Sequence, residues 1–271
     1  NVTLDVSQDG GTTWTVPHPT TTGNIGAGQT AGIGKSITWA ADTDFDNQYQ
    51  TDMKVRLRAT DSFSNLGAFA QSTNFTADTA NPVVSNVIAS QNADSDTVTI
   101  HYDLADDSTT GLTVNIDISS DGGLTWTVPV TTLSGNVGIN QTTGTAKTVT
   151  WNAGTDFSNH EQSNLKVRVR GVDNFANIGS FTESSAFSLD TKAPVVSNVT
   201  AQQQPGTTVI SISYDITDAI TNGHFVDFNV SSDSGVTWIV PVITVSGDVG
   251  AGIATGTKTL FWNAGIDYGG N

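Results

Sequence analysis

An eight-residue phrase of the form Ser-x-Asp-x-Gly-x-Thr-Trp occurs three times in this chain, at residues 7–14, 119–126 and 231–238. Its aspartates are Asp9, Asp121 and Asp233, and each lies 112 residues from the next. A fixed long period indicates a tandem array, because each period encodes one structural unit that is copied along the chain. We therefore expect the chain to consist of copies of one module.

The modules are separated by short segments that contain proline. Residues 78–87 and 190–199 are closely similar, and Pro82 and Pro194 occupy the same place in each. Proline fixes φ and lacks a backbone N–H, which suits the entry to an edge strand. These segments predict three domains: a partial repeat over 1–80 without its first strands, a complete repeat over 81–192, and a partial repeat over 193–271 without its last strands.

The complete repeat is expected to consist of strands. Apolar and polar residues alternate along 97–104, 114–118 and 165–170, as they do in strands with one buried face. Further strands expected at 83–89, 124–129, 146–151 and 180–189 raise the total to about seven strands in ~110 residues. This pattern predicts an all-β fold of tandem β-sandwich modules, of the immunoglobulin or fibronectin type III kind.

The repeated phrase is the Asp-box pattern, which predicts a structural hairpin corner. The aspartates (Asp9, Asp121 and Asp233) can accept backbone hydrogen bonds across the turn, and glycine supplies the positive φ. The tryptophans that end the phrase are Trp14, Trp126 and Trp238. We expect them to fill successive cores, as we expect of Trp151; the alternative is that Trp126 and Trp151 form a surface platform for sugars.

The charge of the chain is strongly acidic, with 26 acidic residues, 10 basic residues and a net charge of −16. Such a surface repels nucleic acid and anionic membranes, so neither is expected as a partner, and no apolar run is long enough to span a membrane. Divalent cations are attracted instead. The chain has no cysteine, which excludes disulfides and thiol chemistry.

Aspartates are predicted to gather where one module joins the next. If strands alternate in direction, the linker enters a module at the end that carries its 103–111, 130–144 and 173–179 loops. Oxygen-rich junctions suit Ca²⁺, which takes six to eight oxygen ligands; solvated turns that need no metal are the alternative. The expected calcium ligands are Asp78, Asp103, Asp106 and Asp173 at the first junction, and Asp190, Asp215 and Asp218 at the second.

Several motifs together resemble the immunoglobulin-like and fibronectin type III-like repeats of secreted and surface-attached bacterial proteins. They are the strand from Val98 to Asp106, the Asp-box hairpin, the segment from Thr150 to Asp156 and the strand from Lys166 to Arg170. The Asp-Thr-x-x-Pro linker is similar to the junctions of large bacterial adhesins, where Ca²⁺ stiffens the array. The resemblance implies an extracellular or cell-surface location.

No constellation typical of an enzyme recurs with the period. The Asp-box also occurs in sialidases, but their propeller blades repeat at about 40–50 residues. The four histidines fall at different places in the repeat, so no zinc set recurs. Three tandem copies of a catalytic domain would be unusual, so we expect no catalytic residues.

The sequence therefore favours a non-enzymatic extracellular structural or adhesive array, such as a stalk, fibre or surface filament. Its expected partners are neighbouring copies of itself, further repeats of the same chain, or surface glycans. The alternative is a glycan-binding accessory region of a secreted carbohydrate-active enzyme. The partial repeats are expected to come from a longer chain, and assembly of a filament by strand addition is the other interpretation.

Overall fold

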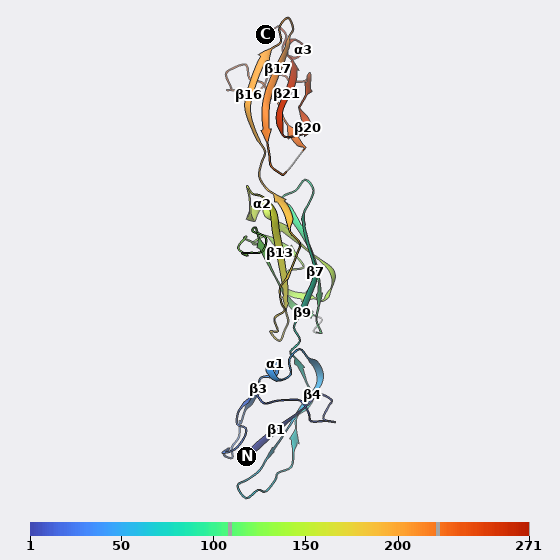
Figure 1. The fold of residues 1–271 in the computed structure, drawn as a ribbon, viewed down its shortest axis with the longest axis vertical. Helices are drawn as coiled ribbons and strands as arrows, with labels where there is room; N and C mark the ends of the chain where they lie inside the picture. The colour runs from blue at the N-terminus through green and yellow to red at the C-terminus, as the bar shows by residue number, and fades with distance from the viewer. Residues whose placement is uncertain (108–109, 221–222, 271) are drawn as a thin grey trace. The chain divides into compact units, whose positions relative to one another are not determined.

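The structure is a computed structural model that describes residues 1–107, 110–220 and 223–270 (Figure 1). It is an all-β protein built from antiparallel sheets, as the sequence predicts. Among the described residues, helix is confined to the single turns α1 (Ala41–Asp44), α2 (Ala153–Asp156) and α3 (Ala264–Asp267).

The chain forms two compact units, each described by itself below. The first contains residues 1–90, 98–151 and 166–186, and the second contains 91–97, 152–165 and 187–271. Because this division passes through the complete repeat, the domain boundaries at 80/81 and 192/193 stay a prediction.

The N-terminal part of the first unit has a sheet with the order β1-β4-β5, and β6 also pairs with β4. These strands are β1 (Val2–Ser7), β4 (Tyr49–Ala59), β5 (Ala70–Gln71) and β6 (Phe75–Asp78). The short strands β2 (Thr21–Gly23) and β3 (Ile37–Trp39) pair only with each other in the described structure. Leu4, Val6, Val16 and Met53 form the buried core of this part.

Residues 83–183 contribute two further sheets, ordered β10-β12-β8-β7 and β11-β9-β13-β14. Their strands are β7 (Val83–Gln91), β8 (Thr97–Ala105), β9 (Thr110–Ser119), β10 (Leu133–Gly135), β11 (Gly138–Thr142), β12 (Gly144–Asn152), β13 (Glu161–Val172) and β14 (Thr182–Glu183). Burial alternates along β8 and β9, so one face of each strand is apolar and inward. Tyr102 and Trp151 are fully buried.

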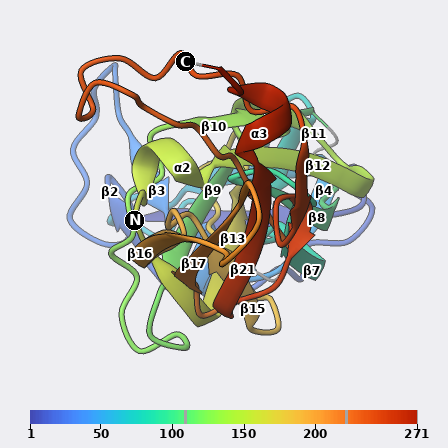
Figure 2. The same ribbon diagram turned by 90° about the horizontal axis from the view of Figure 1, so that it is seen from above.

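The second unit contains a sheet with the order β16-β17-β21-β19 and a pair formed by β18 and β20. These strands are β16 (Val195–Gln203), β17 (Val209–Thr217), β18 (His224–Val226), β19 (Val245–Gly247), β20 (Gly250–Ile253) and β21 (Gly256–Asn263). β17 and β21 run side by side, and α3 follows β21 (Figure 2). The unit also includes β15 (Phe187–Asp190), which pairs with the first residues of β13.

The strand predicted at 124–129 is wrong, because only one bridge forms there, between Ile118 and Val128. Pro129 follows Val128 and has no N–H, so it cannot extend the ladder as a donor. The predicted 130–144 loop instead contains the short strands β10 and β11.

Candidate functional site: acidic clusters at the linkers

A cluster of three carboxylates lies in the first unit, where the linker meets the complete repeat. Asp78 ends β6, Asp106 follows β8, and Asp173 follows β13. One oxygen from each carboxylate lies within 4.8 Å of the other two. Asp78 and Asp173 are 6% and 7% exposed. The structure thus brings together three of the residues that the sequence nominated for calcium.

A tight turn orients Asp173 in this cluster. Its Oδ1 accepts the N–H groups of Phe175 and Asn177, each at 2.8 Å, and its Oδ2 accepts Nδ2–H of Asn177 at 2.6 Å. The same Asn177 amide donates to the carbonyl oxygen of Asp78 at 3.1 Å. The turn therefore fixes the carboxylate and ties it to the linker.

The same turn forms around Asp61, one period earlier. Asp61 accepts the N–H groups of Phe63 and Asn65 and the Asn65 side-chain amide, at 2.7–2.9 Å. These bonds lower the pKa of Asp61, the largest contribution coming from the Asn65 side chain. Because this turn is exposed, the local sequence Asp-x-Phe-x-Asn is sufficient to form it.

A second cluster lies in the second unit and consists of Glu161, Asp190 and Asp218. Glu161 begins β13 and lies directly opposite Asp190 on β15. Its Oε1 accepts the N–H of Ala219 at 2.7 Å, and its Oε2 lies 2.7 Å from Nζ of Lys192. The hydrogen bonds from Lys192 and then Ala219 lower the pKa of Glu161 to about 2.

Sequence reasoning missed Glu161 as a member of this cluster. The signal in the sequence was the 112-residue period, which makes Glu161 equivalent to Tyr49. In the folded sheet, Tyr49 lies opposite Asp78 on β6. The cross-strand register that creates this neighbour is a property of the folded sheet.

Two of the nominated aspartates lie outside the clusters found in the described structure. Asp103 accepts Nδ2–H of Asn86 at 2.6 Å and the N–H of Ala146 at 2.7 Å. Asp215 accepts Nδ2–H of Asn198 at 2.6 Å and the Thr257 hydroxyl at 2.7 Å. These bonds lower the pKa of both carboxyls, with the asparagine side chain as the largest contribution in each. Both residues therefore join neighbouring strands.

The three Asp-box turns share one hydrogen-bond pattern. In the second turn, the Ser119 hydroxyl donates to Asp121 Oδ1 at 2.7 Å and accepts the N–H of Gly123 at 2.8 Å. Asp121 accepts the N–H and hydroxyl of Thr125 at 2.8 and 2.6 Å. Equivalent bonds hold the turns at Asp9 and Asp233.

The expectation that the Asp-box tryptophans fill the cores is wrong. Trp238 is 61% exposed, and Trp14 and Trp126 are only partly buried. The rings of Trp14 and Trp126 lie over the guanidinium groups of Arg56 and Arg168, at 4.3 and 4.5 Å. The residues before the bridge at Val128 form an irregular loop and not a strand. The inward and outward alternation of a strand therefore does not determine the direction of Trp126.

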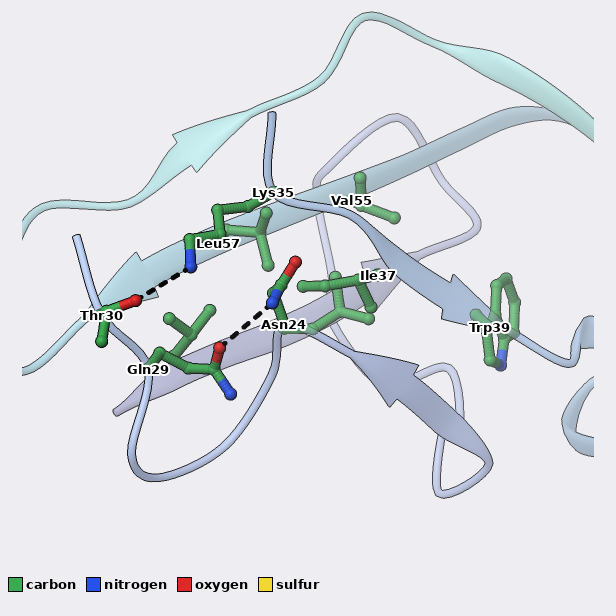
Figure 3. Close-up of a pocket in the computed structure, with 10 residues that line it drawn as sticks. Asn24, Gln29, Thr30, Lys35, Ile37, Trp39, Val55 and Leu57 are labelled. Atoms are coloured by element: carbon green, nitrogen blue, oxygen red, sulfur yellow. Dashed lines mark hydrogen bonds between the residues drawn. The ribbon is translucent and has the colours of Figure 1, made fainter. Parts of the chain in front are cut away.

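An apolar pocket of about 300 Å³ opens in the N-terminal part of the first unit (Figure 3). Ile37, Trp39 and Leu57 line its apolar wall, and Lys35 donates a hydrogen bond to Thr30 at its rim. The residues one period later than Ile37 and Trp39 are Val149 and Trp151, both fully buried where β12 pairs with β8. Ile37 and Trp39 therefore lie on the strand that corresponds to β12, with which β8 pairs edge to edge in its sheet.

The chemistry of the first cluster suits a hard cation, because all three side chains offer oxygen and two of them are buried. No helix in the described parts of the chain is both long and apolar enough to cross a membrane. No protein-family model matches the chain, and a search of curated proteins finds no similar sequence.

Proposed function

We propose that this chain belongs to a non-enzymatic extracellular or cell-surface array, in which all-β modules act as spacers and the linker that contains Asp78 binds Ca²⁺. The observation that carries the proposal is the cluster of Asp78, Asp106 and Asp173. Burying several carboxylates together is costly unless a positive charge compensates them. A calcium ion would supply that charge and could complete its coordination with carbonyl and water oxygens.

The position of the cluster gives calcium a mechanical role. Asp78 belongs to the linker, whereas Asp106 and Asp173 belong to loops of the complete repeat. An ion shared by these residues would hold the linker to the module that follows it. Extracellular calcium modules bind with dissociation constants of roughly 10⁻⁴–10⁻³ M, so the ion would be held at extracellular calcium concentrations.

The test compares the intact chain in millimolar Ca²⁺ and in chelator by differential scanning calorimetry and small-angle scattering. Calcium should raise the melting temperature of the wild type and narrow its distribution of dimensions. Asp173→Asn should abolish both effects, whereas Asp61→Asn, the same change in the equivalent exposed turn, should preserve them. Equal calcium responses in these two variants, or none in the wild type, would refute the proposed calcium linker.

Glycan binding is the second candidate, and the exposure of Trp238 favours it, because exposed aromatic rings stack on sugars. A glycan-array screen of the wild type and Trp238→Ala distinguishes the two candidates. Saturable binding that is lost in the variant supports a glycan-binding module. The spacer proposal expects none.

A further inference from the structure

The two acidic clusters share two of their three positions, because Asp78 corresponds to Asp190 and Asp106 corresponds to Asp218. Asp78 and Asp190 are one period apart, and each ends the last short strand before a linker. The N–H two residues later donates to Oδ1 in each case, from Ala80 at 3.1 Å and from Lys192 at 3.0 Å. The linkers therefore leave their strands with the same local turn, and their side chains can be compared position by position.

The second cluster contains a cation from the chain itself. Nζ of Lys192 lies 2.7 Å from Oε2 of Glu161, whose side chain is only 11% exposed. The pKa of Lys192 is raised, first by its hydrogen bond to Glu161 and then by the charges of Glu161, Asp218 and Asp190. Glu161 is thus the direct partner of the ammonium group, and the charges of Asp190 and Asp218 add to the attraction.

The first cluster has different residues at the two corresponding positions. Ala80 stands where the second linker has Lys192, and Tyr49 stands where β13 has Glu161. Ala80 carries no charge, and Tyr49 lies opposite Asp78 in the strand register that places Glu161 opposite Asp190. The added glutamate and the added lysine therefore occur together.

We propose that Lys192 supplies to Glu161, Asp190 and Asp218 the positive charge that Ca²⁺ supplies to Asp78, Asp106 and Asp173. The comparison with the first cluster rests on the proposed function, but the role of Lys192 does not. A divalent cation and the ammonium group compete for the same oxygens and repel each other. The two linkers consequently differ in their need for metal, although their sequences are closely similar.

Calcium titration by calorimetry of the intact chain tests this inference. The wild type should bind about one Ca²⁺, and Lys192→Ala should gain a second site. Lys258→Ala, which removes a lysine from β21 in the same unit, is the control and should behave as the wild type. Tyr49→Glu combined with Ala80→Lys should transfer the lysine arrangement to the first cluster and remove its calcium site.

Melting in chelator gives a readout that does not depend on the first site. Without metal, Lys192→Ala should lower the melting temperature of the second unit, and millimolar Ca²⁺ should restore it. If the wild type binds no calcium but Lys192→Ala gains a site, the proposed function fails and the role of Lys192 holds. If Lys192→Ala changes neither the number of sites nor the melting temperature in chelator, the role of Lys192 is refuted.

Discussion

Ser119 and Ser231 make the same hydrogen bonds in different surroundings, and this difference predicts different costs of removing each hydroxyl. The Ser119 side chain is 0% exposed, and its Oγ accepts the N–H groups of Gly123 at 2.8 Å and Asp121 at 3.3 Å. Ser231 accepts the equivalent bond from Gly235 at 2.8 Å, but residues 232–239 around its turn are exposed.

Ser119→Ala would leave the N–H of Gly123, a partly buried residue, without its acceptor. An unsatisfied buried donor costs about 1–3 kcal/mol, and the weaker bond to Asp121 is lost as well. We therefore expect Ser119→Ala to lower the free energy of unfolding by about 2–3 kcal/mol. In Ser231→Ala, water can replace the hydroxyl, and we expect a loss below about 1 kcal/mol.

The assay is native-state hydrogen exchange, because the two units need not unfold together. Amides of β9 report the first variant, and amides of residues 224–230 report the second. The ratio of exchange rates between variant and wild type gives the change in free energy for each region. Equal losses of unfolding free energy in the two variants would refute this prediction, because burial would then have no influence on the cost of removing the hydroxyl.

Two further predictions concern a close backbone contact and the Asp-box carboxylates. A Cβ on Gly179 would lie 2.1 Å from the carbonyl oxygen of Pro82, whereas a Cβ on Gly67, one period earlier, would lie 3.0 Å from its nearest neighbour. In urea unfolding, Gly179→Ala should therefore lower the free energy of unfolding by about 2–3 kcal/mol, and Gly67→Ala should lower it by less than about 1 kcal/mol. Similar losses in the two variants would contradict the close contact between Gly179 and Pro82. Hydrogen bonds from Thr125 and Ser119 lower the pKa of Asp121 to about 2, below the value of about 3.9 in unfolded chains. The stabilisation by Asp121 should thus be complete above about pH 4 and be lost as the pH falls through 2, and a carboxyl titration midpoint near 4 by carbon-13 NMR would contradict this.

The strands and the first acidic cluster followed from local patterns in the sequence. Alternation along 97–104 placed Ile100 and Tyr102 on the inner face, and both are fully buried. Alternating strand directions were enough to predict that Asp78 meets Asp106 and Asp173. Both inferences use only the period of a strand and the order of elements, which the sequence encodes directly.

Features that depend on irregular backbone or on the register between strands were not predicted from the sequence. Trp126 follows a loop, so the parity of a strand does not determine its direction, and its position over Arg168 requires the folded sheet. The single turn α2 also escaped, although Asn152 caps it by accepting the N–H of Thr155 at 3.2 Å. An asparagine before a short Ala-Gly-Thr-Asp run was the available signal, and it was too short to show helical periodicity.

Glu161 and Lys192, which distinguish the second linker from the first, lie apart in the sequence but form an ion pair in the fold. Ala80 and Lys192 lie within segments that otherwise match closely, and Tyr49 and Glu161 lie on strands far away in sequence. Tyr49 pairs with Asp78 and Glu161 pairs with Asp190, so each strand residue lies beside the linker that carries the other difference. A glutamate alone would add a third negative charge beside Asp190 and Asp218, and a lysine alone would lack its closest partner. The two changes are therefore coupled, and under the proposal that Ca²⁺ binds the first cluster they would distinguish a linker that needs metal from one that carries its own cation.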